Sequence, residues 1–275
     1  MKQLWRWTPA HPTGGERIGR LDSQWFVVDG RRLHVRVSVE SVPADALAVV
    51  LVHGLGVAST YVVPTAVRLA CEYRVYAPDL PGFGHSDKPP RALDIPELAD
   101  ALVAWMDTAG LERVALVGNS LGCQISVDAA IRYQARVERL VLQGPTMDRH
   151  ARTLRQQLGR GLLDVLREHP SQPLVQTRDY AKFGLRRSLR TFRFAVRDRI
   201  EDKLPLVQAP TLVVRGERDP IVSQRWAEEV TQLLPSGRLV VIPGAPHTLN
   251  YSTPRAFVRV LRPFLEGAGS DEETI

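Results

Sequence analysis

A serine between two glycines, placed where an apolar run ends and a helical pattern begins, gives the first constraint on this fold. The apolar run Val114–Val117 ends at Gly118, and Ser120 and Gly122 follow. Because a helical pattern starts next, the sequence predicts a strand, a tight turn and a helix, with Ser120 at the tip of the turn. Glycine suits both flanking positions, since the two backbones approach closely there and leave no room for a Cβ. A serine presented in this way is a candidate nucleophile.

The composition is that of a globular protein with a large core. Hydrophobic residues make up 44% of the 275 positions and charged residues 24%, close to the average for such proteins. No apolar run reaches the roughly 20 residues of a membrane span, and the first residues lack the apolar segment of a secretory signal. With only two cysteines, we expect a cytoplasmic protein with reduced thiols and no transmembrane segment. The sequence does not indicate an oligomeric state.

The positive charge is concentrated in one segment. The chain has a formal net charge of +6, and residues 149–203 contain 14 Lys and Arg against 6 Asp and Glu. The remainder of the chain therefore carries a charge of about −2. Because the surplus is confined to one segment, we expect no nucleic-acid partner.

Strands alternate with helices along most of the chain. A hairpin is predicted at Asp29–Gly30, because an Asp-Gly pair between two strand patterns, here 24–30 and 31–39, favours a tight turn. Further strands are predicted at 47–52, 73–77, 114–117, 137–143, 211–215 and 238–242. Helices are predicted at 64–70, 96–109, 227–234 and 257–265. This alternation predicts an α/β fold with a mostly parallel sheet covered by helices on both faces.

The alternation is interrupted once, by a helical insertion at residues 148–203. We therefore expect residues 1–147 and 204–275 to form one discontinuous core. The insertion carries an apolar stripe and, beside it, an arginine stripe. The apolar stripe consists of Leu185, Leu189, Phe192 and Val196, and the arginine stripe of Arg186, Arg190, Arg193 and Arg197. The arginines either form a solvated helix face or attract an anionic substrate, with Arg190 and Arg193 as the substrate-binding residues.

His247 is the best-placed base for Ser120. A serine hydroxyl becomes a strong nucleophile when a base takes its proton, and parallel α/β sheets bind ligands at the carboxyl ends of their strands. Of the seven histidines, His247 directly follows the last predicted strand. Asp219 follows the preceding strand and is the expected acid that orients the imidazole. Asp148, after the sixth strand, and Glu217 are alternatives for this acid.

Two backbone N–H groups are candidates for stabilising an oxyanion. The N–H of Leu121 directly follows the serine at the start of a helix, where the helix dipole favours negative charge. The N–H of Leu55 lies in the turn His53–Gly56, after a strand. Because both groups belong to the backbone, the two leucine side chains would only shape the pocket.

Five short motifs follow one another in a fixed order over residues 22–266. They are His53–Gly56, Asp79–Ser86, Gly118–Gly122, Gly216–Asp219 and His247. On these motifs the chain resembles the α/β-hydrolase family. The resemblance implies an eight-stranded sheet with a helical cap inserted after strand six, which agrees with the insertion at 148–203. Cys123 departs from the glycine that the family often has at this position, without consequence for the chemistry.

The site residues and the resemblance favour a serine hydrolase. His247 would deprotonate Ser120, which attacks a carbonyl and forms an acyl-enzyme, and water would then release the acid. The expected substrate is a small acyl compound, namely a carboxylic ester, a lactone or a thioester. Neither a metal-binding nor a nucleotide-binding motif occurs in the sequence, so we expect no metal and no cofactor.

Two other functions are compatible with the same motifs. Gly118–Gly122, together with Gly144-Pro145 after the sixth strand, also resembles the branch of hydrolases that cleaves C–C bonds of ring-fission dienoates. That branch usually carries a tryptophan directly after the catalytic histidine, where this chain has Thr248. The third function is a non-catalytic ligand-binding protein or receptor of the same fold. Binding alone would not need a serine, an acid and a histidine together.

Overall fold

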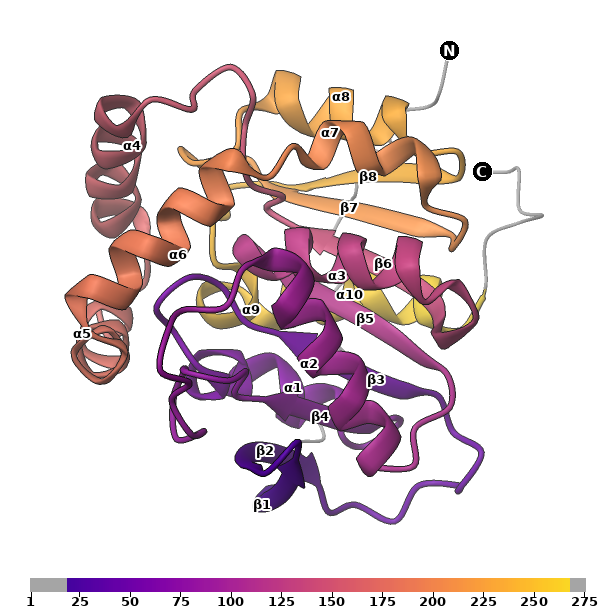
Figure 1. Ribbon diagram of the computed structural model, residues 1–275. Helices are drawn as coiled ribbons and strands as arrows, with labels where there is room; N and C mark the ends of the chain where they lie inside the picture. Colours follow the sequence, from indigo (N-terminus) through magenta and orange to yellow (C-terminus); the bar gives the residue numbers. More distant parts are fainter. Residues whose placement is uncertain (1–18, 268–275) are drawn as a thin grey trace, which may run out of the picture.

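The computed structural model describes residues 19–267, except for the side chains of residues 154, 158, 173 and 174. Eight strands form one sheet in the order β1-β2-β4-β3-β5-β6-β7-β8, with helices on both of its faces (Figure 1). The predicted eight-stranded, mostly parallel sheet is therefore confirmed. The ends of the predicted core, residues 1–18 and 268–275, lie outside the described residues.

The sheet begins with the predicted hairpin. Strands β1 (Leu21–Val28) and β2 (Arg31–Ser38) pair antiparallel, and the turn between them has a positive φ at both residues, 49° at Asp29 and 72° at Gly30. Asp and Gly are the residues that tolerate this left-handed conformation best. β2 also runs antiparallel to β4, and all other neighbours are parallel.

The parallel strands are buried because helices cover both sides of the sheet. Every residue of β3, β5 and β7 is buried, as expected for continuous apolar runs. The six strands after the hairpin are β3 (Ala48–Val52), β4 (Arg74–Pro78), β5 (Val114–Asn119), β6 (Val137–Gln143), β7 (Thr211–Gly216) and β8 (Gly237–Ile242). Their carboxyl ends meet at one edge, where the loops with the candidate residues begin.

Two apolar clusters form the core, one on each face of the sheet. The first contains Trp105 and Trp226 and lies under α2 (Ile95–Thr108), α3 (Leu121–Arg132) and α8 (Gln224–Leu233). The second contains Phe257 and lies under α1 (Val63–Leu69), α9 (Leu249–Ser252) and α10 (Pro254–Leu265). Short 3₁₀ turns occur at η1 (Ser59–Val62), η2 (Gln134–Arg136) and η3 (Leu204–Leu206). Within residues 19–267, no helix is long and apolar enough to cross a membrane.

Two helices begin three residues earlier than their apolar patterns predict. α8 begins at Gln224 because the side chain of Ser223 caps it by accepting a hydrogen bond from the N–H of Trp226. α10 begins at Pro254. Proline fits the first turn of a helix because the N–H groups of that turn make no hydrogen bond within the helix, so the lack of an N–H in proline costs nothing. Capping residues thus extend both helices beyond their apolar pattern.

A helical cap follows β6, as predicted. It consists of α4 (Leu154–Arg167), α5 (Gln172–Phe183) and α6 (Leu185–Arg197), and the short α7 (Ile200–Lys203) leads back to β7. Figure 1 shows α4, α5 and α6 to one side of the sheet. The apolar stripe of α6 is only partly buried: Phe192 and Val196 pack against the core, whereas Leu185 and Leu189 are exposed.

Candidate active site

Ser120 occupies a strained turn between β5 and α3. Its φ of 53° and ψ of −116° lie outside the regions that residues with a side chain usually adopt. Close packing enforces the turn, because a Cβ on Gly122 would collide with the carbonyl oxygen of Val52, and one on Gly118 with the carbonyl of Gly122. The N–H of Ser120 donates to the carbonyl oxygen of Gln143 in β6 (3.0 Å). The predicted strand, turn and helix are all present.

His247 lies in the loop after β8 and is only 5% exposed. The side-chain amide of Gln143 donates to the backbone carbonyl of His247 (2.7 Å). The ring packs against Gly144, where a Cβ would come within 2.7 Å of the ring carbon Cε1. The end of β6 therefore holds both the Ser120 turn and the His247 loop. From the sequence, Gly144 stood out only for its place after the sixth strand, and Gln143 was not singled out.

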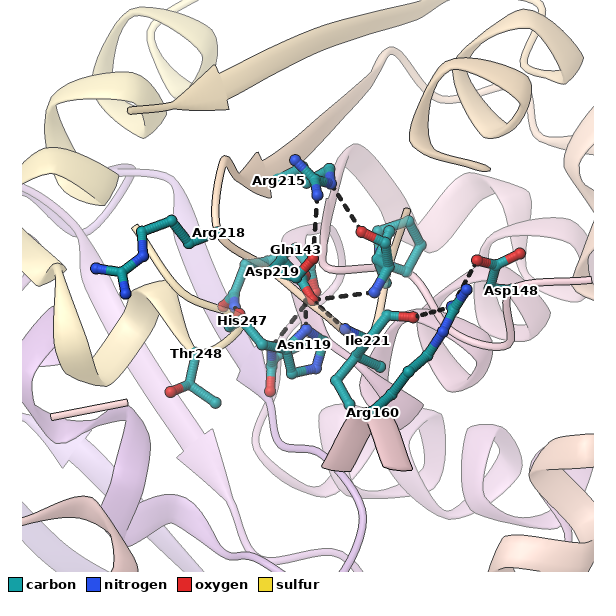
Figure 2. Close-up of polar contacts among 12 residues, drawn as sticks. Asn119, Gln143, Asp148, Arg160, Arg215, Arg218, Asp219, Ile221, His247 and Thr248 are labelled. Atoms are coloured by element: carbon teal, nitrogen blue, oxygen red, sulfur yellow. Dashed lines mark hydrogen bonds and ion pairs between the residues drawn. The ribbon is translucent and has the colours of Figure 1, made fainter. Parts of the chain in front are cut away.

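Asp219 is the acid that contacts His247. Its Oδ2 lies 2.7 Å from Nδ1 of His247, and its Oδ1 accepts hydrogen bonds from the N–H groups of Ile221 (2.7 Å) and Val222 (2.9 Å). Arg215 donates to the backbone carbonyl of Asp219 (3.0 Å) and so fixes the loop (Figure 2). When Nδ1 carries a proton toward Asp219, Nε2 is left as the basic nitrogen.

The pKa of His247 reflects two opposing effects. Burial would lower it, but the charge and the hydrogen bond of Asp219, with further contributions from Asp164 and Glu168, raise the pKa of His247 to about 9. Negative charge next to a histidine favours its protonated form. The site is thus built to stabilise an imidazolium, the species that forms when this histidine takes a proton.

The two alternative acids have other partners. Asp148 accepts from Arg160 (2.7 Å), from the N–H of His150 (2.9 Å) and from the hydroxyl of Ser223 (2.9 Å). Burial alone would raise the pKa of Asp148, but these hydrogen bonds lower it. Glu217 accepts from the N–H of Gly244 (2.7 Å). Within the described residues, neither carboxylate has a hydrogen bond to His247.

Ser120 and His247 are brought to the same edge of the sheet without a direct hydrogen bond between their side chains, as far as residues 19–267 are described. Both are instead anchored to Gln143, one through its backbone and the other through its side chain. Catalytic hydrogen bonds are often long in a free enzyme and tighten when substrate binds. This geometry is therefore compatible with proton transfer between the two residues.

The two candidate oxyanion donors lie in the turn of Ser120 and in the turn that follows β3. Leu121 is the first residue of α3, so its N–H has no partner within the helix. Among the described residues, no backbone hydrogen bond outside the regular elements uses the N–H of Leu55. The neighbouring N–H of Gly54 donates to the hydroxyl of Tyr61 (3.0 Å), which in turn donates to the side chain of Asn119. Tyr61 thus fixes the 53–56 turn against the turn that carries Ser120.

The hydrogen bonds of His53 and Asp79 hold the loops that follow β3 and β4. His53 bonds the carbonyl of Gly54 (3.0 Å) and accepts from the N–H of Leu80 (3.1 Å). Asp79 lies next to His34 and His85, and one ligand atom of each lies within 4.8 Å of the others. The Asp79 carboxylate already accepts from the N–H groups of Ser59 and His85 and from His34. These hydrogen bonds show that the Asp79 carboxylate fixes the loops around it.

Helix α4 turns a polar face toward the loops that carry Asp219 and His247. Three contacts hold it there, the first of which Figure 2 shows. They run from Arg160 to the carbonyl of Ile221 (2.8 Å), from Arg167 to the carbonyl of Arg218 (2.8 Å), and from the N–H of Thr248 to Glu168 (2.7 Å). The cap therefore contacts residues next to both members of the acid–histidine pair.

Asp164 lies on the same face of α4, one turn after Arg160 and one turn before Glu168. Its Oδ1 is buried without a hydrogen-bond partner in the described part of the chain. Burial raises the pKa of Asp164 to about 7, although the nearby His247 opposes this shift. Asp164 and Glu168 therefore bring two carboxyl groups close to His247. No sequence motif marks them, because their role depends on which side of α4 faces inward.

Arg190 and Arg193 are exposed on α6. In the part of the chain that the structure describes, no hydrogen bond or ion pair joins either of them to Ser120, Asp219 or His247. The arginine of α6 that contacts the core is Arg187, which donates to the carbonyls of Pro89 (2.7 Å) and Arg91 (3.0 Å). Any effect of Arg190 and Arg193 on a substrate would thus act from the cap surface.

Two relatives in sequence are named as hydrolases. The 2-(acetamidomethylene)succinate hydrolase of Mesorhizobium japonicum is 27% identical over 241 residues, which cover 78% of this chain and 86% of that protein. The 2-hydroxy-6-oxo-2,4-heptadienoate hydrolase of Pseudomonas putida is 29% identical over 252 residues, which cover 79% and 88%. Each alignment covers more than three quarters of this chain.

Solved structures agree with this assignment. The crystal structure of a membrane phospholipase A, described as a bacterial virulence factor, is similar with a TM-score of 0.77 and 25% identity, covering 91% of this chain and 87% of that one. Residues 49–260, more than half of the chain, match the family model described as the alpha/beta hydrolase family. With its sheet, its cap and the turn at Ser120, this chain is a hydrolase that belongs to the alpha/beta hydrolase family.

Proposed function

We propose that this hydrolase is a serine hydrolase that cleaves a carboxylic ester, a lactone or a thioester through an acyl-enzyme. The observation that carries the proposal is the 2.7 Å contact between His247 and Asp219 at the edge of the sheet where the strained turn presents Ser120. A nucleophile, an acid and a base, in this order along the chain, are the parts that acyl transfer needs.

The chemistry would proceed in two steps. Nε2 of His247 takes the hydroxyl proton of Ser120 while Oγ bonds to the substrate carbonyl carbon, and the N–H groups of Leu55 and Leu121 stabilise the oxyanion. The imidazolium then gives its proton to the departing alkoxide or thiolate, which leaves the acyl group on Ser120. In the second step His247 deprotonates water, which attacks the acyl-enzyme, and the acid product leaves with Ser120 reprotonated.

A fluorophosphonate probe tests the nucleophile. We expect the wild-type chain to be labelled on Ser120, and the Ser120→Ala and His247→Ala variants to lose labelling. Ser236→Ala, which removes an exposed serine outside the site, serves as the matched control and should be labelled like wild type. An unlabelled wild-type protein that is folded by circular dichroism would contradict the proposal and favour a non-catalytic binding protein.

The second candidate is a C–C bond hydrolase that acts on a ring-fission dienoate. It is favoured by the 29% identity to the heptadienoate hydrolase and by Gly144, which packs on His247. It is disfavoured by Thr248, which stands where that branch usually has tryptophan. Turnover of short p-nitrophenyl esters, compared with that of a ring-fission dienoate under the same conditions, separates the two candidates. Hydrolysis of the dienoate alone would overturn the ester proposal.

The cap and its arginines complete the proposal. We assign residues 1–147 and 204–275 to the core and 148–203 to the cap, and we place the enzyme in the cytoplasm, where it acts on a small acyl compound without metal or cofactor.

If Arg190 and Arg193 attract an anionic substrate, replacing both with Gln raises KM for a carboxylate-bearing ester and leaves KM for a neutral ester unchanged. An unchanged KM for the charged ester would show that both arginines belong to a solvated helix face and do not bind the substrate.

A further inference from the structure

Helix α4 has its polar face toward the protein and its apolar face toward solvent. The inward residues are Arg160, Asp164 and Arg167, as described above. The outward residues are Leu162, Leu163, Val165 and Leu166, of which Leu162 is 67% and Leu166 76% exposed. A surface helix of a globular protein normally shows the opposite orientation. A contiguous exposed apolar face of this kind marks an interaction surface.

The apolar surface continues from α4 across the other cap helices. A groove is lined by Val165 of α4, Tyr180 and Ala181 of α5, and Leu185 of α6. Leu185 is 75% exposed, and Leu189 follows it one turn later on the same side of α6. Because residues of all three helices share one groove, their exposed leucines and valine form one surface, which we call the cap face.

The charges around the cap face are of one sign. Residues 154–197 contain ten Lys and Arg but only three carboxylates, and all three carboxylates are turned inward. These are Asp164 and Glu168, which face the His247 loop, and Asp179, which is buried. The exposed arginines at the cap face are Arg155, Arg186, Arg190, Arg193 and Arg197, and none of them forms an ion pair with another described residue.

We propose that the cap face docks on an anionic lipid surface, with the leucines of α4 and α6 inserted among the lipids and the arginines at the headgroups. A face made of leucine and arginine without exposed carboxylates fits a surface that is apolar inside and negatively charged at its boundary. Arg155 lies two turns before Leu162 on the same side of α4, so charge and apolar surface can reach the boundary together. The docking does not depend on the proposed chemistry at Ser120.

Vesicle co-sedimentation tests the docking. We expect the full chain to bind vesicles of phosphatidylcholine mixed with phosphatidylglycerol, and to bind much less at high salt or to phosphatidylcholine alone. The Ser120→Ala variant should bind like wild type, which separates a failure of the docking proposal from a failure of the proposed hydrolase function. Equal binding to neutral and anionic vesicles, or binding to neither, would overturn the proposal.

Two double variants test the residues of the cap face. Leu162→Ser with Leu166→Ser should reduce vesicle affinity roughly a hundredfold, and Arg155→Gln with Arg186→Gln roughly thirtyfold. The matched controls remove exposed groups elsewhere, with Val27→Ser and Leu206→Ser for the leucines, and Arg238→Gln and Arg259→Gln for the arginines. Because all these side chains are exposed, the variants should fold, which circular dichroism checks. Control variants that lose as much affinity as the cap variants would contradict the proposal.

A second copy of the chain is the competing occupant of the cap face. Light scattering after size-exclusion chromatography distinguishes it without lipid. We expect the same molar mass for wild type and for the Leu162→Ser, Leu166→Ser variant. A wild-type dimer that becomes a monomer in this variant, together with absent vesicle binding, would assign the cap face to self-association and overturn the lipid proposal.

Discussion

At the scale of single residues, the contrast between Asp219 and Asp148 shows which of the two carboxylates reaches His247. Asp219 contacts His247, whereas Asp148 is hydrogen-bonded to Arg160 and Ser223. Both are buried carboxylates in loops that follow neighbouring strands, so position in the sequence does not distinguish them. Their partners do, because an acid that orients a histidine has to reach its Nδ1.

Replacing Asp219 with Asn should therefore lower kcat by about 10⁴-fold, the cost of a wrong histidine tautomer in serine proteases. Asp148→Asn is the matched control, and we expect it to keep kcat within about tenfold while it lowers the free energy of unfolding by about 1–3 kcal/mol, because Arg160 loses a charged partner. Steady-state kinetics and urea denaturation measure the two effects. The opposite pattern, with activity lost in Asp148→Asn only, would move the acid's role to Asp148.

Asp164 leads to a pH-dependent prediction. Burial lowers the pKa of His247, but Asp219 and, to a smaller extent, Asp164 and Glu168 outweigh it and raise the pKa to about 9. A general base is active only when it is neutral. Activity should therefore rise with pH through the pKa of His247. Asp164→Asn removes one nearby negative charge, so it should lower the pKa of His247 and move the rising limb of kcat/KM to lower pH.

A pH–rate profile of Asp164→Asn against wild type measures this shift. Glu217→Gln removes a carboxylate that bonds Gly244 instead of facing His247, and we expect its profile to match wild type. If the rising limb of the Asp164→Asn profile stays at the wild-type pH or moves to higher pH, the Asp164 carboxylate does not raise the pKa of His247. A structural role alone would change the height of the profile and leave its limb where it is.

At the scale of elements, the turn between β5 and α3 tests the link between packing and site geometry. A Cβ on Gly122 would meet backbone atoms of Val52 and His53, which cannot move without breaking the sheet. Gly122→Ala should therefore lower the free energy of unfolding by at least about 2 kcal/mol, as overpacking does, and abolish activity. Gly159→Ala on α4, where a Cβ meets nothing within 4 Å, should raise stability by about 0.5–1 kcal/mol.

Urea denaturation and ester turnover of both glycine variants check this prediction. Equal stabilities of Gly122→Ala and wild type would mean that the turn is not closely packed. The comparison uses the same substitution twice, so the difference between the two sites reports the surroundings and not the propensity of alanine.

The elements also show how far the sequence alone could lead. The strands, the core helices and the loops with Ser120, Asp219 and His247 follow from apolar periodicity and from the position of each residue after a strand. The inner face of α4 does not follow, because periodicity shows that a helix has two faces but not which one is turned inward. The usual rule would bury Leu162 and Leu166, yet the structure turns Asp164 inward because Arg160, Arg167 and Glu168 find backbone partners in the core loops.

At the scale of the whole molecule, Glu168 connects the cap to the core. It accepts hydrogen bonds from the N–H of Thr248 and from the hydroxyl of Ser252, so it ties the end of α4 to the loop of His247. Charged hydrogen bonds contribute about 1.5–3 kcal/mol each. A change at this one position should therefore affect how tightly the cap covers the site.

We expect Glu168→Gln to increase amide hydrogen exchange across α4 while exchange in β5 and β7 stays at the wild-type rate. Arg193→Gln, which alters the exposed side of the cap, serves as the control for a change of charge without loss of an anchor. Hydrogen-exchange mass spectrometry resolves the two regions. Unchanged exchange in α4 would show that Glu168 does not hold the cap, and faster exchange throughout the chain would indicate general destabilisation instead.

The central claim is that Ser120 carries the acyl group, and trapping the intermediate tests it most directly. A p-nitrophenyl ester is mixed with the enzyme, the reaction is quenched within the first turnover, and the peptide that contains Ser120 is weighed by mass spectrometry. We predict a mass increase of one acyl group on this peptide in wild type and none in Ser120→Ala. Release of p-nitrophenol at the wild-type rate, with no acyl group on Ser120 at any quench time, would contradict the account.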